Sequence, residues 1–399
     1  MEHLPQVLFQ LFVLLLATKS GDELFKRLGQ PALVGEILGG VIVGPAVLGW
    51  YQINAETSLF AQIGAVLLLF EVGVHTRIGE VARVGGTAMA VALLGVALPF
   101  VGGYLAGSAL DLSLEGRIFL GASLTATSVG ITSGALRSFG ALATASGRVI
   151  LGAAVIDDVL ALLIVAVAVG LAANDVSVER VALLLALAAA FIGIVVVGGT
   201  GILRRRRSLL TDPRFAETPF LPGMILMLGL AALAAQIGLA AIIGAFLAGL
   251  VVGESSERQA LETETAPVAA FFTPFFFGFV GAQVDPAAFG SLSTLALLVG
   301  ITLLAVVAKF AGSFLGAIRT GRQRAALIAW GMVPRGEVEI IVAGLALTAG
   351  AIKPDLYAVI VGMVVITAVL VPPLMGPLVR RAEPEAAQPA TAPPTAELE

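Results

Sequence analysis

Two adjacent aspartates, Asp157 and Asp158, lie in the middle of an apolar run that extends from Val149 to Asn174. The run is long enough to cross a lipid bilayer as an α-helix. A carboxylate at the centre of a membrane costs roughly 2.5–3.5 kcal/mol on insertion scales. Two carboxylates in succession therefore require a water-filled path, a counter-charge or a bound cation, and the fold must supply one of these.

The composition indicates a membrane protein with several spans. Of the 399 residues, 58% are hydrophobic and only 13% are charged, whereas soluble domains average about 25% charged residues. The 47 glycines suit helices that pack closely in lipid through small residues. The chain has no cysteine, which excludes disulfides, thiol chemistry and cysteine metal sites.

Apolar stretches between charges and turn residues predict an all-α polytopic membrane protein with thirteen transmembrane helices. The stretch 218–253 contains 36 residues without a charge. It is too long for one helix at about 20 residues per crossing, so two helices are predicted there. The predicted spans are 4–20, 31–48, 58–76, 84–107, 116–137, 147–172, 179–203, 217–236, 238–253, 259–283, 291–317, 324–350 and 355–379.

The positions of Lys and Arg predict how the spans are oriented. When alternate loops are assigned to one side, that side holds 18 of the 23 basic residues and the other holds 3. Because positive residues collect on the cytoplasmic side, we expect the N-terminus outside and the C-terminus in the cytoplasm. The tail 382–399 is rich in Ala, Pro, Glu and Thr, and we expect it to be disordered.

Two of the spans are predicted to be broken helices. The first has Thr125 to Gly130 at its centre, where hydroxyls and glycine can satisfy the backbone of an unwound helix. The second has Gly331 to Glu337 at its centre, including Pro334, which removes a backbone donor. Counted along the chain, the two spans are an odd number of spans apart, so they cross the membrane in opposite directions. Paired interrupted helices in matching halves indicate a binding site at the membrane midplane.

Lys309 is the only charge inside the run from Leu292 to Ile318. We expect it to pair with Asp157, because neighbouring side chains on a helix point about 100° apart and both aspartates cannot face one partner. A static salt bridge between helices is the alternative. Three more charges, Arg335, Glu337 and Glu339, cluster in the second broken helix and are expected to form an internal network, with a purely structural role for Arg335 and Glu339 left open.

Other charged side chains have less specific interpretations. Glu36 lies in a Gly-rich span and either supports the fold or lines a funnel. Glu71 is near a span end and is expected to reach the interface. His75 also lies near a span end and is expected to be structural, with a role in the pH response as the alternative.

The same residues carry a resemblance to a known family. Five segments resemble, in the same order, the monovalent cation:proton antiporter-2 family, and the resemblance extends to about Pro377. They are Pro31 to Gly40 followed by Gly44-Pro45, Leu67 to Gly73, Thr125 to Ser128, Ile156-Asp157-Asp158, and Arg335-Gly336-Glu337.

The resemblance implies a homodimer in which a core domain moves against a dimerisation domain, with two crossed broken helices in the core. Asp158 would bind the cation and exchange it for protons, and Asp157 would pair with Lys309, whose lysine is typical of electrogenic members. The implied division is 1–108 as mainly dimerisation helices with 84–108 joining the core, 116–172 as core, 179–207 as a linker helix, 217–283 as dimerisation helices and 291–379 as core.

Together these features predict a secondary active Na⁺/H⁺ antiporter of a prokaryotic inner membrane, and not an enzyme. It would exchange cytoplasmic Na⁺ or Li⁺ for external protons, with Thr127 and Ser128 helping to replace the water shell of the cation. No cofactor and no nucleic-acid partner are expected. The alternatives are K⁺/H⁺ exchange, a cation channel and an intramembrane aspartyl protease, although adjacent aspartates that point apart fit protease chemistry badly.

Overall fold

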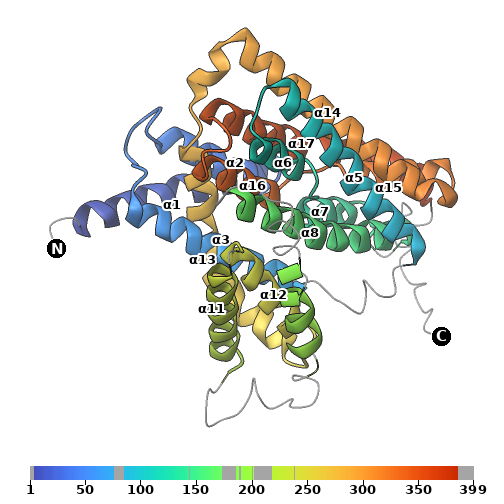
Figure 1. Ribbon diagram of the computed structural model, residues 1–399, viewed down its shortest axis with the longest axis horizontal. Coiled ribbons are helices and arrows are strands. Elements are labelled where there is room, and N and C mark those ends of the chain that lie inside the picture. The colour runs from blue at the N-terminus through green and yellow to red at the C-terminus, as the bar shows by residue number, and fades with distance from the viewer. Residues whose placement is uncertain are drawn as a thin grey trace, which may run out of the picture.

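The computed structural model confirms the all-α prediction. It describes residues 4–75, 85–142, 144–172, 186–187, 190–199, 201, 218–237 and 239–384, and within these ranges the regular structure is helical (Figure 1). The predicted linker helix 179–207, with the arginine run 204–207, lies largely outside the described residues. Within this range, the described residues Ile194–Gly199 form a short π-helical segment.

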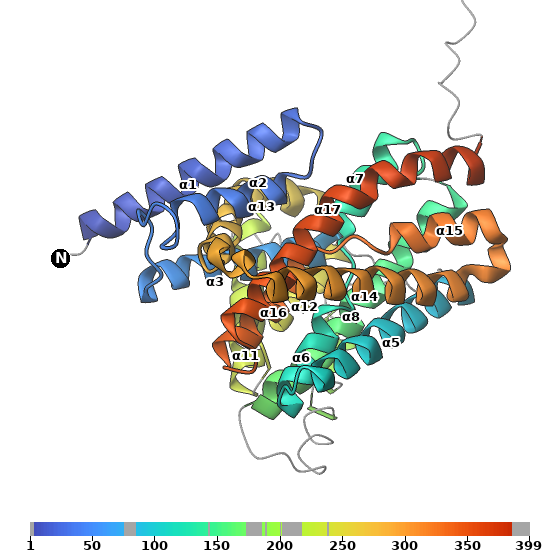
Figure 2. The same cartoon turned by 90° about the horizontal axis from the view of Figure 1, so that it is seen from above.

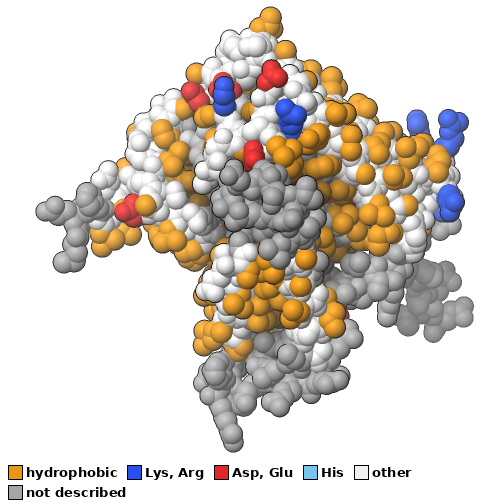
Figure 3. Space-filling model, viewed as in Figure 1, with side chains coloured by type: hydrophobic (Ala, Val, Ile, Leu, Met, Phe, Trp, Pro, Cys, Tyr) orange, Lys and Arg blue, Asp and Glu red, His pale blue; other side chains and the backbone are white. Residues whose placement is uncertain are grey.

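The helices follow the predicted spans closely. Among the described residues, six helices are long and apolar enough to cross a membrane by length and composition. Hydrophobic side chains are spread over the described part of the face drawn in Figure 3, where charged side chains are few. The helices are α1 (Leu4–Arg27), α2 (Ala32–Val43), α3 (Ala55–His75), α5 (Gly86–Ala109), α6 (Leu114–Ser123), α7 (Val129–Ser138), α8 (Ala145–Ala172), α11 (Phe220–Gln236), α12 (Ala241–Gly253), α13 (Arg258–Ala282), α14 (Leu292–Ala317), α15 (Arg322–Gly331), α16 (Glu337–Thr348) and α17 (Pro354–Ala382).

Both predicted breaks are present. The first span divides into α6 and α7 at residues 124–128, and the second divides into α15 and α16 at residues 332–336. The predicted division of 218–253 also occurs, because α11 ends at Gln236 and α12 begins at Ala241. Hydroxyl-rich and proline-containing sequence inside an apolar run therefore located the unwound segments.

Two span ends differ from the prediction. Helix α1 continues past residue 20 to Arg27, and charged pairs one turn apart support the extension, such as Lys26 with Asp22 (2.7 Å) and Arg27 with Glu23 (2.8 Å). Helix α2 ends at Val43 rather than near residue 48, because Gly44 and the following Pro45 turn the chain.

The described helices pack as two groups. The first group consists of α1, α2, α3, α11, α12 and α13, and the second consists of α5, α6, α7, α8, α14, α15, α16 and α17. In the second group, α5 and α14 lie side by side in both views (Figures 1 and 2).

Glycines allow close helix contacts in both groups. In the first group, a Cβ on Gly249 of α12 would lie 2.0 Å from the carbonyl oxygen of Phe70 in α3. In the second, a Cβ on Gly312 of α14 would lie 2.2 Å from the carbonyl oxygen of Leu94 in α5. Only glycine permits these backbones to approach so closely, which is the usual way that helices associate in lipid.

The beginning of the predicted disordered tail is ordered instead. Helix α17 includes Ala382, and Glu383 is buried beneath the first turn of α8. Its Oε1 accepts hydrogen bonds from the amide (3.3 Å) and hydroxyl (2.7 Å) of Ser146, and it pairs with Arg324 Nε at 3.4 Å. A carboxylate at a helix N-terminus is favourable because it meets unpaired amides and the positive end of the helix dipole. The rest of the predicted tail, 385–399, lies outside the described residues.

Truncation after Arg381 should therefore destabilise the protein. Loss of Glu383 strands the Ser146 donors, at a cost of about 1–3 kcal/mol, so the thermal midpoint in detergent should fall. Truncation after Pro384 is the matched control and should leave the midpoint unchanged. Equal midpoints for the two truncations would show that Glu383 does not hold α8 and α15 to the end of α17.

Candidate functional site

The centre of α8 carries the two adjacent aspartates. Asp157 and Asp158 are 0% and 2% exposed, and the neighbouring Ala153, Ala154 and Ala161 are also buried. The site is therefore enclosed by protein, and polar groups of the chain must offset the cost of removing two carboxylates from water.

The side chain of Lys309 extends from α14 to Asp157 of α8. Its ammonium is fully buried and donates hydrogen bonds to Asp157 Oδ2 and to the carbonyl oxygen of Thr125. Thr125 stands in the first break, where the helical ladder is interrupted and carbonyls lack their usual partners. The lysine thus joins three elements: α8, α14 and the unwound segment between α6 and α7.

The two breaks meet at this point. The amide of Ser128 donates to the Pro334 carbonyl at 2.9 Å, and the Thr132 hydroxyl donates to the Gly331 carbonyl at 2.9 Å. The hydroxyl of Thr127 lies 2.8 Å from Asp157 Oδ2 and 3.0 Å from the carbonyl oxygen of Met332. Thr127 therefore connects the aspartate to both unwound segments.

Close backbone approach is required where the breaks meet. A Cβ on Gly336 would lie 2.6 Å from the hydroxyl oxygen and the Cβ of Ser128. A larger residue at position 336 would push the two breaks apart, so the glycine in Arg335-Gly336-Glu337 has a steric reason.

Arg335, which lies in the second break, also holds the two breaks together. Its fully buried guanidinium donates to the carbonyl of Ala126 and, at 3.1 Å, to that of Ala305. Its Nη1 is 3.6 Å from Glu339 Oε1, and the other Glu339 oxygen accepts the Gly336 amide at 2.9 Å. The arrangement satisfies the Ala126 carbonyl at the first break and the Gly336 amide at the second. Glu337 begins α16, and its side chain lies outside the described residues.

The site can offer several oxygen atoms to a small cation. Asp157 Oδ1 accepts no hydrogen bond from the described residues, and carbonyl and hydroxyl oxygens of the breaks lie close by. Carboxylate, carbonyl and hydroxyl oxygens are the ligands that hard cations prefer. Broken helices at the midplane supply such ligands in transporters.

Other candidate residues lie away from this centre. Glu36 of α2 is 3.3 Å from Lys19, which also pairs with Asp22 at 3.2 Å. The ring Nδ1 of His75 lies 2.8 Å from the backbone oxygen of Glu71, one turn earlier in α3. None of these contacts involves the aspartate pair.

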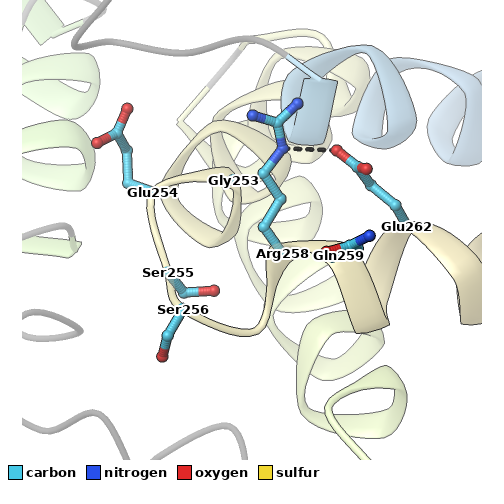
Figure 4. A pocket seen from close by; sticks show the side chains of 7 residues that line it. All are labelled: Gly253, Glu254, Ser255, Ser256, Arg258, Gln259 and Glu262. Atoms are coloured by element: carbon cyan, nitrogen blue, oxygen red, sulfur yellow. Dashed lines mark hydrogen bonds and ion pairs between the residues drawn. The ribbon is translucent and has the colours of Figure 1, made fainter. Parts of the chain in front are cut away.

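A polar pocket of about 590 Å³ lies at the turn between α12 and α13 (Figure 4). Arg258 points toward Glu262 across it and also donates to the His75 backbone carbonyl at 3.3 Å. The pocket contains neither Asp157 nor Asp158. It is lined by Gly253, Glu254, Ser255, Ser256, Arg258, Gln259 and Glu262.

Sequence reasoning expected freed carbonyls around Thr127 and Ser128 but did not identify two sets of contacts at the site. The first is backbone: the carbonyls of Thr125, Ala126 and Met332 are contacted by functional side chains, and no residue type signals this. The second is Thr132, whose hydroxyl bridges the breaks. Its place in a hydroxyl-containing run beside the break was the available signal.

The chain is similar in sequence and in fold to known sodium/proton antiporters. The Na⁺/H⁺-K⁺ antiporter GerN of Bacillus cereus is 34% identical over 92% of this chain and 95% of its own length. The high-affinity Na⁺/H⁺ antiporter NhaS3 of Synechocystis is 31% identical over 96% and 92%. The sodium proton antiporter MjNhaP1 of Methanocaldococcus jannaschii shares the fold, with a TM-score of 0.71, 19% identity and coverage of 96% of this chain and 99% of that one.

The family described as "Sodium/hydrogen exchanger, transmembrane" matches residues 11–381, nearly the whole described chain. The match includes both broken helices, the Asp157–Asp158 pair and Lys309. The protein therefore belongs to the transmembrane sodium/hydrogen exchanger family.

Proposed function

We propose that this chain is a secondary active Na⁺/H⁺ antiporter and that Asp158 is the carboxylate that exchanges a cation for protons. The observation that carries the proposal is the buried Asp157–Asp158 pair at the meeting point of two broken helices, with Lys309 bonded to Asp157. A carboxylate in a membrane interior is expected to serve transport, because its burial is unfavourable and such residues usually mark ion or proton pathways.

Coupling would follow from competition. Asp158 cannot hold a proton and Na⁺ together, so the site crosses the membrane loaded with one or the other. Release of Na⁺ to the outside would be followed by protonation and return, with protons entering down their gradient. Thr127, Ser128 and freed carbonyls of the breaks would replace part of the water shell of the cation.

Lys309 would give the exchange its electrical character. When a cation occupies the aspartates, Lys309 would leave Asp157 and release its proton, so that the lysine is neutral in the cation-bound state. Two protons would then bind for each cation lost, one at Asp158 and one shared by the Lys309–Asp157 pair, whose titration belongs to the pair. One net charge would move per cycle.

The second group would move as the core against the first group, which would form the dimerisation surface of a homodimer in the bacterial inner membrane. The separate packing of the two groups supports this arrangement. The basic-residue count supports a cytoplasmic C-terminus.

The choice of Na⁺ as substrate rests on the relatives. NhaS3 and an Enterococcus hirae relative carry Na⁺/H⁺ in their names, and GerN adds K⁺. Dye-monitored exchange in proteoliposomes, with Na⁺, Li⁺ and K⁺ compared across pH, tests the proposal. Proton movement driven by Na⁺ or Li⁺ but not by K⁺ is expected. Flux that does not saturate and is not coupled to protons would indicate a channel instead.

Asp158→Asn should abolish Na⁺-driven proton movement, because an amide can neither release a proton nor offer a full charge to a cation. Asp355→Asn makes the same change at an exposed position and should keep wild-type exchange. Both proteins should purify as folded species. Near wild-type exchange by Asp158→Asn would show that another group carries the ions.

Lys309→Gln should lower stability and reduce voltage dependence or activity. It leaves Asp157 without its buried counter-charge, and breaking such a pair costs roughly 3–5 kcal/mol. Charge movement on a solid-supported membrane should be present in the wild type and reduced in the variant. If a pH step at saturating Na⁺ produced no current in the wild type, exchange would be electroneutral and Lys309 would be a structural partner.

A further inference from the structure

The second group of helices has two hydrophobic cores that differ in what they touch. The core nearer the arginine-rich loops contains residues of the second group alone, such as Ile150, Leu327 and Met375. The core nearer the arginine-poor loops also takes in residues of the first group. Phe119, Ile341 and Tyr357 of the second group belong to one cluster with Phe246 and Val280 of the first.

The first group has clusters of its own on both sides, and the one toward the arginine-poor side includes Val43, Tyr51 and Ala282. Toward the arginine-rich loops, Phe70, Met227 and Leu261 form a cluster whose described members all come from the first group. Among the described residues, the cluster that joins the two groups lies mainly toward the arginine-poor side, although it also reaches Leu250 and Val251 in the last turn of α12. Buried apolar contact keeps water out, so this arrangement closes the arginine-poor side.

A hydrogen bond spans the two groups on the closed side. Tyr357, in the first turn of α17, is fully buried and donates its hydroxyl to the Val280 carbonyl of α13 at 3.3 Å. Val280 is in the last turn of α13, where carbonyls lack a helical partner. A buried tyrosine hydroxyl needs an acceptor, and here the acceptor belongs to the other group.

We propose that the Tyr357–Val280 hydrogen bond and the mixed cluster around it form the outer gate of the transporter, which keeps the two groups together on the arginine-poor side. By the basic-residue count, the closed side faces outward. Release of a cation to the outside requires the two groups to separate there, and this bond must break. The inference rests on the proposed antiport function, since it assigns Tyr357 to one half of that cycle.

The role of the Tyr357 hydroxyl can be tested separately, because its removal leaves the surrounding cluster intact. Phenylalanine would fill the same space in the cluster. The Val280 carbonyl would still accept the amide of Gln283, which lies 3.3 Å away. Tyr357→Phe should therefore remove only the bond between the groups and raise the population of the outward-open conformation. A neutral hydrogen bond of ordinary net strength corresponds to about a twofold to tenfold change in an equilibrium constant.

Cysteine labelling can measure this shift, because the chain has no cysteine of its own. Val284→Cys places a thiol in the mixed cluster, four residues beyond Val280, and Val371→Cys places one in the core that the second group forms alone. The rate of labelling by a charged maleimide would be followed for the full chain in lipid nanodiscs. Both faces are then accessible, and no transport is needed.

Adding Tyr357→Phe should raise the labelling rate at Val284→Cys by about twofold to tenfold and leave that at Val371→Cys unchanged. Tyr104→Phe is the matched control, since Tyr104 lies in α5 and stacks on Phe100 within the same helix. It should change neither rate.

An unchanged rate at Val284→Cys, or an equal rise at both cysteines, would overturn the outer gate. The first result would mean that the bond does not hold the groups together, and the second that the substitution loosens the whole fold. Failure of Na⁺ exchange by the wild type in proteoliposomes would instead contradict the proposed function, and the two failures are distinguishable.

Discussion

The rest of the structure depends on how the buried charge of Asp157 is satisfied. Lys309, the Thr127 hydroxyl and the carbonyls around them surround one carboxylate deep in the protein. A buried ion pair stabilises a fold only when its remaining donors and acceptors are also satisfied. Here the unwound segments provide partners for the Lys309 ammonium and for Asp157 Oδ2, so the broken helices and the ion pair depend on one another, whereas Asp157 Oδ1 has no partner among the described residues. In the proposed mechanism, these same groups would be exchanged for a cation.

Moving such a site requires a fold with one tightly packed body and one surface along which it can slide. Glycine contacts such as Gly312 against Leu94 bind helices closely within a group, whereas contact between the groups is concentrated on the arginine-poor side. In the proposed alternating access, one set of contacts between the groups would be exchanged for another. Tyr357 contributes a directional bond to this interface, where hydrophobic packing alone would specify no particular alignment.

Much of the fold could be predicted from the sequence, because hydropathy, charge and helix-breaking residues act locally. Span positions follow from apolar runs, and Pro334 and the hydroxyls around Thr127 indicate the breaks. What could not be predicted is long-range. Glu383 lies in a stretch with the composition of a disordered tail, yet its partner Ser146 is 237 positions away. Tyr357 meets Val280 at a separation of 77, and no local pattern announces either contact. The carbonyls that surround Lys309 are invisible in sequence because every residue has one.

Proton release on Na⁺ binding tests the central claim, that cation and proton compete at one carboxylate site. Isothermal titration of the purified protein with Na⁺, in buffers of different ionisation enthalpy, gives the number of protons released per cation bound. The account predicts between one and two protons at a pH where the free site is protonated, with weaker Na⁺ binding as the pH falls. Na⁺ binding that released no protons and did not change with pH would contradict it.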